Sequence, residues 1–183
     1  VPLLAAGDIV IDGGNSYYRD DIRRAHELDA SKIHYLDVGT SGGVAGFDRG
    51  YCLMIGGEKD VVVHLAPIFA TLAPGIDAAT RTPGRDKRQG TAEQGFLHCG
   101  PHGAGHFVKM VHNGIEYGDM QAFGEGFATM VKSDLVEDPA AVMSSWRDGS
   151  VERSWLTDLL AIAFKSDSTR KSMPPVDNES GEA

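Results

Sequence analysis

The chain has 183 residues, enough for one complete domain or for one domain and part of another. Its net charge of −9, without a long basic run, argues against nucleic acid or an anionic membrane as a partner, although a few local Lys and Arg side chains could bind a phosphorylated substrate. With two cysteines and no apolar segment of the length a membrane span needs, we expect a cytoplasmic protein without disulfides.

Predicted strands and helices alternate in the first hundred residues. A strand that runs into a glycine turn is predicted over residues 7–16, and further strands over 33–38, 52–57 and 95–99. Helices are predicted over 18–28 and 59–72, and a polar loop over 79–94. The β-branched run that ends at Gly13 is typical of a parallel sheet. This alternation predicts an α/β unit over residues 1–100.

Only helices are predicted after this unit, over residues 106–132, 139–146 and 150–164. The first of them contains four glycines, each costing about 1 kcal/mol relative to Ala, which favours a close approach of another backbone or a ligand. We therefore expect a helical unit over 101–165, followed by a poorly ordered polar tail over 166–183.

One face of the long predicted helix carries five side chains that can form hydrogen bonds or transfer protons. They are Lys109, His112, Asn113, Glu116 and Tyr117, spaced as neighbours on one helical stripe. These groups are suited to moving protons on a polyhydroxy substrate. A lysine and a glutamate on a helix are more often a solvated surface, but the surrounding glycines favour a function.

Two further groups of residues have a structural interpretation. His98, Cys99, His102 and His106 suggest a metal site, but Pro101 and nearby glycines interrupt any helical spacing, so we expect no metal. We expect both cysteines, Cys52 and Cys99, to be small buried side chains.

The beginning of the chain lacks the Gly-x-Gly-x-x-Gly motif that opens a doubly wound dinucleotide-binding domain. An α/β unit without its first strands would expose a sheet edge, so we expect a fragment of a longer fold.

Four segments in this order resemble the decarboxylating 6-phosphogluconate dehydrogenases: residues 12–16, 41–43, 53–57 and 103–120. The last segment is the most specific, and residues 79–100 resemble the shorter bacterial branch, which often prefers NAD. The resemblance implies the C-terminal part of a Rossmann-like dinucleotide-binding domain followed by a helical 6-phosphogluconate dehydrogenase domain.

The resemblance also implies a reaction in the pentose phosphate pathway. The C3 hydroxyl of 6-phosphogluconate is oxidised with reduction of NAD or NADP, and loss of carbon dioxide leaves ribulose 5-phosphate. Lys109 would be the base, which must be neutral to act, and Glu116 the acid that protonates the enediol. Family members complete the active site as homodimers, so a homodimer is expected.

Substrate-binding roles follow from the same resemblance. Asn15 would lie between the nicotinamide and the substrate, and the remaining binding residues would be Ser41, Gly42, Gly43, His112, Asn113 and Tyr117. Two alternatives remain open: a related β-hydroxyacid dehydrogenase acting on a smaller acid, and a catalytically incomplete fragment that binds a ligand or a partner subunit. Glu116 favours the sugar-phosphate reaction, because a simple oxidation needs no enediol protonation.

Overall fold

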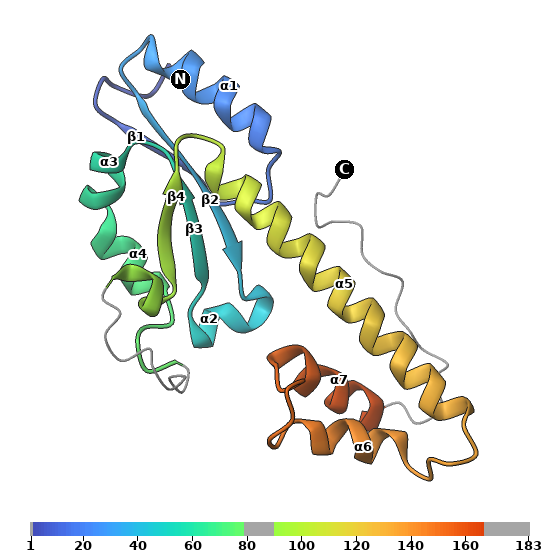
Figure 1. The fold of residues 1–183 in the computed structure, drawn as a ribbon. Coiled ribbons are helices and arrows are strands. Elements are labelled where there is room, and N and C mark those ends of the chain that lie inside the picture. Colours follow the sequence, from blue (N-terminus) through green and yellow to red (C-terminus); the bar gives the residue numbers. More distant parts are fainter. Residues whose placement is uncertain (1, 79–89, 167–183) are drawn as a thin grey trace. The chain divides into compact units, whose positions relative to one another are not determined.

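The computed structural model describes residues 2–78 and 90–166, which form two compact units. The division falls between His112 and Asn113, inside the longest helix. The first unit contains a sheet, its helices and the start of that long helix, and the second contains the rest of the helix and two shorter ones (Figure 1). The domain boundary expected after residue 100 stays a prediction.

The first unit is built on a four-stranded sheet in the order β1-β2-β3-β4. The strands are β1 (Ile9–Asp12), β2 (His34–Ser41), β3 (Cys52–Gly56) and β4 (Phe96–Gly100), close to the predicted positions. β1 pairs with β2 and β3 with β4 in parallel, but β2 and β3 are antiparallel. The segment between β2 and β3, with the short helices η1 (Gly43–Ala45) and α2 (Gly46–Arg49), is too short for a parallel crossover.

The helices of the first unit follow the prediction with one correction. The predicted helix at 18–28 is confirmed as α1 (Tyr18–Asp29), whereas the predicted single helix over 59–72 is wrong. It is divided into α3 (Lys59–His64) and α4 (Ala66–Leu72), because Pro67 has no N–H to continue the hydrogen-bond ladder. Helix η2 (Thr91–Gln94) lies in the predicted loop, whose residues 79–89 are outside the described part.

The core of this unit lies between the sheet and helices α3 and α4. Burial of these apolar side chains is the main stabilising contribution to the unit. The buried core residues are Leu36, Val38, Leu53, Ile55, Val61, Val62, Leu65, Phe69 and Phe96. The residues of β2 and β3 that contact the long helix, Asp37, Gly39 and Gly56, alternate with these core residues, so that helix lies against the opposite face of the sheet.

The second part of the chain is helical, as predicted. The helices are α5 (Ala104–Lys132), α6 (Pro139–Trp146) and α7 (Trp155–Ser166), the last beginning beyond its predicted start at Ser150. Asp138 caps α6 by accepting a hydrogen bond from the N–H of Ala141 at 2.9 Å. The predicted polar tail lies outside the described residues from 167 onward.

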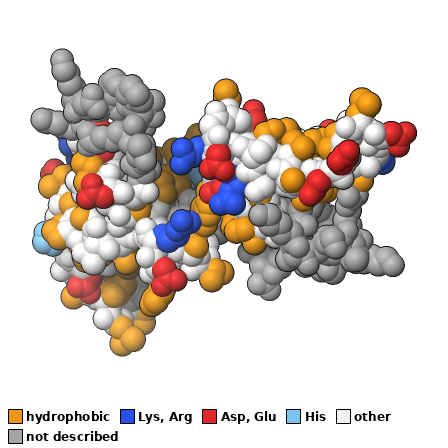
Figure 2. All heavy atoms as spheres, turned by 90° about the horizontal axis from the view of Figure 1, so that it is seen from below, with side chains coloured by type: hydrophobic (Ala, Val, Ile, Leu, Met, Phe, Trp, Pro, Cys, Tyr) orange, Lys and Arg blue, Asp and Glu red, His pale blue; other side chains and the backbone are white. Residues whose placement is uncertain are grey.

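The surface mixes apolar and charged side chains. On the face that Figure 2 shows, orange apolar side chains lie among acidic and basic ones. Several large apolar residues of α5 are exposed, namely Phe107, Met110, Val111, Ile115 and Met120. Among the described helices, none combines the length and the apolar character that crossing a membrane requires.

Candidate functional site

The candidate site begins where helix α5 starts beside strand β2. Asp37, a fully buried residue of β2, accepts hydrogen bonds from the backbone N–H groups of Gly103 and His106, at 2.7 and 3.0 Å. The carboxylate therefore satisfies donors in the first turn of the helix and lies at the positive end of the helix dipole. This cap, provided by a distant strand, fixes where α5 begins relative to the sheet.

Three glycines allow α5 to approach the sheet closely. A Cβ on Gly39 of β2 would overlap the side chain of Lys109 and lie 2.7 Å from the carbonyl oxygen of Gly105. A Cβ on Gly56 of β3 would lie 2.7 Å from the backbone nitrogen of Gly105, and a Cβ on Gly105 would overlap the backbones of β2 and β3. Lys109 is thereby placed against β2, close to the end of the strand.

Ser41 and His112 meet at that strand end. The hydroxyl of Ser41 and Nε2 of His112 are 3.3 Å apart, although 71 residues separate them in the chain. Gly42 and Gly43 follow Ser41 with φ of 134° and 51°, a region of backbone conformation that favours glycine. Residues predicted from two different segments, Ser41, Lys109 and His112, are therefore brought together.

Cys52 lies in the same neighbourhood, paired with Ser41 across the antiparallel strands. Surrounding protein atoms partly desolvate the Cys52 thiol and raise its pKa, and the nearby charge of Lys109 partly opposes this shift. The expectation of two buried cysteines is wrong, because Cys52 is exposed and Cys99 is partly exposed. Both lie near strand ends at the rim of the sheet, where side chains are only partly covered.

Asn15 lies in the turn that follows β1. Since β1 and β2 are parallel, their carboxyl ends lie at the same end of the sheet, and the turn therefore lies at the same end as Ser41. The turn is held by Asp12, which accepts a hydrogen bond from the N–H of Gly14 at 3.0 Å and another from the hydroxyl of Ser16 at 2.8 Å. The Asn15 side chain is left exposed.

A buried network joins this turn to α5. His106, with a side chain that is 1% exposed, places Nδ1 2.7 Å from Asp21 and Nε2 3.1 Å from the carbonyl oxygen of Gly14. Tyr35 donates a hydrogen bond to Asp21 at 2.8 Å, and the Arg24 guanidinium lies 3.6 Å from the same carboxylate. Helix α1, strand β2 and helix α5 are thus connected through one fully buried acid.

The network shifts the pKa of two of its members. Burial lowers the pKa of His106, but the hydrogen bond and the negative charge of Asp21 outweigh burial, so the pKa is raised. Burial alone would raise the pKa of Asp12, yet its hydrogen bonds with Ser16 and Gly14 and the charge of His106 leave it lowered. Both shifts favour the charged forms.

The same cluster also has the donor types of a metal site. Asp12, Asp21 and His106 offer ligand atoms within 4.8 Å of one another. However, the Arg24 guanidinium is already 3.2 Å from Asp12, and both ring nitrogens of His106 have protein partners, so a cation would have to displace these groups. The donor set fits a charge-balanced network better than a metal centre.

The other suspected metal ligands have separate partners. His98 lies 2.9 Å from the carbonyl oxygen of Gly57, and His102 lies 3.0 Å from the Glu58 carboxylate. The expectation of no metal site stays a prediction.

The remaining predicted residues, Asn113, Glu116 and Tyr117, continue along α5 in the second unit. Asn113 is buried, Glu116 partly buried and Tyr117 39% exposed. Their spacing from Lys109 within one unbroken helix is the spacing the sequence predicted.

Three residues of the site, Asp21, Asp37 and Tyr35, were not predicted from the sequence. A signal was present for Asp37, because an acid inside the run Tyr35-Leu36-Asp37-Val38 is costly to bury unless it is hydrogen-bonded. No comparable signal marked Asp21, which lies on an ordinary amphipathic helix.

A sheet with parallel strand pairs, a glycine turn after its first strand and a lysine-bearing helix against it is an arrangement typical of nicotinamide-dependent dehydrogenases. Residues 1–80 match the model of the NAD-binding domain of 6-phosphogluconate dehydrogenase, and residues 105–178 match its C-terminal domain. The chain belongs to the 6-phosphogluconate dehydrogenase family.

Known relatives agree with this assignment. The NAD(+)-dependent decarboxylating 6-phosphogluconate dehydrogenase of Haloferax volcanii is 41% identical over 91% of the chain and 49% of its own length. The Bacillus subtilis enzyme of the same name is 37% identical over 96% of the chain and 35% of its length. The Plasmodium falciparum 6-phosphogluconate dehydrogenase, solved with NADP+ and with 6-phosphogluconate, superposes with a TM-score of 0.69 at 32% identity, over 87% of the chain and 31% of its own. The chain spans about half or less of the length of these curated relatives.

Proposed function

We propose that this chain carries out its part of the oxidative decarboxylation of 6-phosphogluconate to ribulose 5-phosphate and carbon dioxide, with reduction of NAD or NADP. The observation that supports this most directly is the placement of Lys109 against Gly39, one turn of α5 before the contact of His112 with Ser41. The base Lys109 and the hydroxyl-binding groups of Ser41 and His112 then lie near the carboxyl end of β2. The turn with Asn15 lies at the same end of the sheet.

In this proposal Lys109 begins the reaction. Its neutral amine would take the proton of the C3 hydroxyl as the hydride leaves C3 for the oxidised nicotinamide, and the resulting ammonium lies beside the new C3 ketone. There it polarises the carbonyl while the carboxylate, which is β to this ketone, leaves as carbon dioxide. The rise of seven residues along an α-helix, about 10.5 Å, separates Lys109 from Glu116, so the two side chains can reach different carbons of one substrate. Glu116 then protonates C1 of the enediol.

Other residues position the substrate. Ser41 and His112 would bind hydroxyls or the carboxylate, helped by the backbone N–H groups of Gly42 and Gly43. Asn113 would hydrogen-bond a further hydroxyl, and Tyr117 would donate to the phosphate. Ser41 and His112 already contact each other, which supports their acting on one ligand.

NAD or NADP would supply the hydride acceptor. The turn after β1 fits the nicotinamide end of such a cofactor, because a Cβ on Gly13 would meet no described atom within 4 Å and the Asn15 side chain is exposed. NAD is slightly favoured, since both named curated relatives are NAD(+)-dependent.

A homodimer and a cytoplasmic location complete the proposal. The exposed apolar side chains of Ile115 and Met120 on α5 suit burial against a partner subunit. The two cysteines are free, as expected in a reducing compartment.

The test is the formation of reduced nicotinamide from 6-phosphogluconate with NAD and with NADP. It uses the chain and, in parallel, the chain joined to the flanking segments of the Haloferax volcanii relative. We expect activity that Lys109→Ala lowers by at least a thousandfold in kcat, since that variant lacks the base. Activity unchanged by Lys109→Ala, or no turnover even in the joined protein, would contradict the proposal.

A further inference from the structure

His106 is a buried group that the proposed mechanism does not use. Its side chain is 1% exposed, and both ring nitrogens lie within hydrogen-bond distance of an oxygen. The oxygen near Nε2 is the backbone carbonyl of Gly14, which can only accept, so Nε2 must carry a proton and donate it. The orientation of the ring is fixed on the other side by Asp21, 2.7 Å from Nδ1.

The Gly14 carbonyl belongs to the peptide bond that leads into Asn15. The preceding peptide is already held, because the Gly14 N–H donates to Asp12. The hydroxyl of Ser16 donates to the same carboxylate from the other side of Asn15. His106 therefore supplies the remaining constraint on a turn of which the Asn15 side chain is the exposed part.

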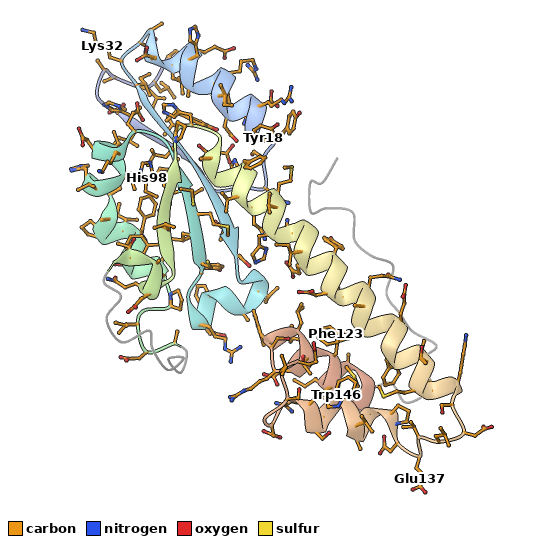
Figure 3. All side chains as sticks on the ribbon, in the orientation of Figure 1. Tyr18, Lys32, His98, Phe123, Glu137 and Trp146 are labelled. Carbon is orange, nitrogen blue, oxygen red and sulfur yellow. The ribbon has the colours of Figure 1, made fainter. Side chains whose placement is uncertain are left out.

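Helix α5 carries both His106, which contacts the turn, and the proposed base Lys109. His106 and Lys109 are one helical turn apart, and the helix start is itself fixed by Asp37 and by the glycine contacts with β2. Tyr18, labelled at the start of α1 in Figure 3, packs edge-on against Phe107 with ring centres 5.3 Å apart. The turn after β1 and the first turns of α5 are thus joined by direct contacts within the first unit.

We propose that His106 is a positioning residue, whose hydrogen bond to the Gly14 carbonyl holds Asn15 at a fixed place relative to Lys109. This inference rests on the proposed function, in which Asn15 lies between nicotinamide and substrate. Small displacements of such groups are costly, because hydride transfer requires close alignment of donor and acceptor.

The kinetic test is a double-mutant cycle of His106→Gln and Asn15→Ala, measured as kcat and KM for 6-phosphogluconate and for NAD in the active protein. We expect His106→Gln to lower kcat about a hundredfold when Asn15 is present and only a few fold in the Asn15→Ala background. Equal losses in both backgrounds would overturn the proposal, because His106 would then act independently of Asn15.

A matched control is His98→Gln. His98, labelled on β4 in Figure 3, also has a ring nitrogen near a backbone carbonyl, that of Gly57 at 2.9 Å, but it lies away from the turn after β1. We expect His98→Gln to keep kcat within a few fold of the unmodified protein. A comparable loss in this control would show a general effect of removing a histidine and would also overturn the proposal.

A measurement that needs no activity separates this inference from the proposed function. In NMR spectra of the chain, the backbone amide signals of Gly14 and Asn15 should shift and broaden in His106→Gln but stay in place in His98→Gln. If His106→Gln does not fold, Asp21→Asn replaces it, because this change weakens the contact that orients the His106 ring. It should shift the Gly14 and Asn15 signals by a smaller amount than His106→Gln does. Unperturbed Asn15 signals in folded His106→Gln, or in folded Asp21→Asn where it is the variant used, would overturn the inference, whereas an inactive unmodified protein counts only against the proposed function.

Discussion

At the scale of the residue, Glu116 separates the proposed reaction from a simple oxidation. Only the decarboxylating reaction forms an enediol that must be protonated, and a positioned acid contributes about 10²–10⁴-fold to such a step. We therefore expect Glu116→Gln to lower kcat for ribulose 5-phosphate formation by at least a hundredfold, with a smaller change in KM. The measurement is steady-state release of carbon dioxide together with reduced nicotinamide.

Glu125 offers the matched control on the same helix. Its exposed carboxylate accepts a hydrogen bond from Gln121 at 2.7 Å and belongs to no part of the candidate site. Glu125→Gln should leave kcat within a factor of about two, since exposed polar contacts contribute little. If Glu116→Gln behaves like Glu125→Gln, Glu116 is not the acid, and the smaller β-hydroxyacid reaction regains support.

The sequence predicted the polar face of α5 but not the buried contacts that connect α5 to α1. Lys109 and Glu116 are close in sequence, so helical spacing alone places them on one face. His106 and Asp21 are 85 residues apart, and no local pattern indicates that they meet. Interactions of this kind depend on how α1 and α5 pack, which is decided by the whole sheet.

At the scale of the element, the docking of α5 on the sheet depends on missing side chains. Gly39→Ala would place a methyl group into the Lys109 side chain and the Gly105 carbonyl, which cannot move without shifting the helix start. We expect it to lower the free energy of unfolding by about 1–3 kcal/mol, the usual cost of overpacking, and to reduce kcat as Lys109 is displaced. Chemical denaturation and steady-state kinetics measure the two effects.

Gly124→Ala on the same helix has the opposite expectation. No described atom lies within 4 Å of a Cβ built at Gly124, and the same holds for Gly114, Gly118 and Gly126. Alanine there should raise the free energy of unfolding by about 1 kcal/mol through helix propensity. The close approach expected at these glycines is thus not made within the described chain, and destabilisation by Gly124→Ala would point to a contact with a ligand or another subunit.

The elements themselves were largely predictable, and two features that were not predicted have local causes. Helix 59–72 has a continuous apolar pattern, and only Pro67 divides it. The antiparallel pairing of β2 and β3 follows from the short connection between them, which cannot make a parallel crossover. The strand sequences themselves do not indicate in which direction the two strands pair.

At the scale of the whole molecule, charged groups in two clusters couple stability to pH. Burial alone would raise the pKa of Glu58, but its backbone hydrogen bond and its contacts with His34 and His102 leave it lowered from 4.5. Asp12 is likewise lowered from 3.8, whereas His106 is raised from 6.5. The contribution of the two carboxylates to stability is lost at low pH, and that of the histidine is lost at high pH. The pH of greatest stability therefore lies between these two ranges.

The sign of each contribution follows from linkage. The stability that Asp12 and Glu58 provide is present above their ordinary pKa values and is lost as the pH falls through the lowered folded values. The stability from His106 is fully present below pH 6.5 and is lost as the pH rises through its raised folded value. We expect the melting temperature of the chain to be highest between about pH 5 and 6.5, with a decline on both sides. In His106→Gln the decline on the alkaline side should become shallower while the acid side is unchanged; an alkaline decline as steep as that of the unmodified chain would show that His106 is not charged in the folded protein.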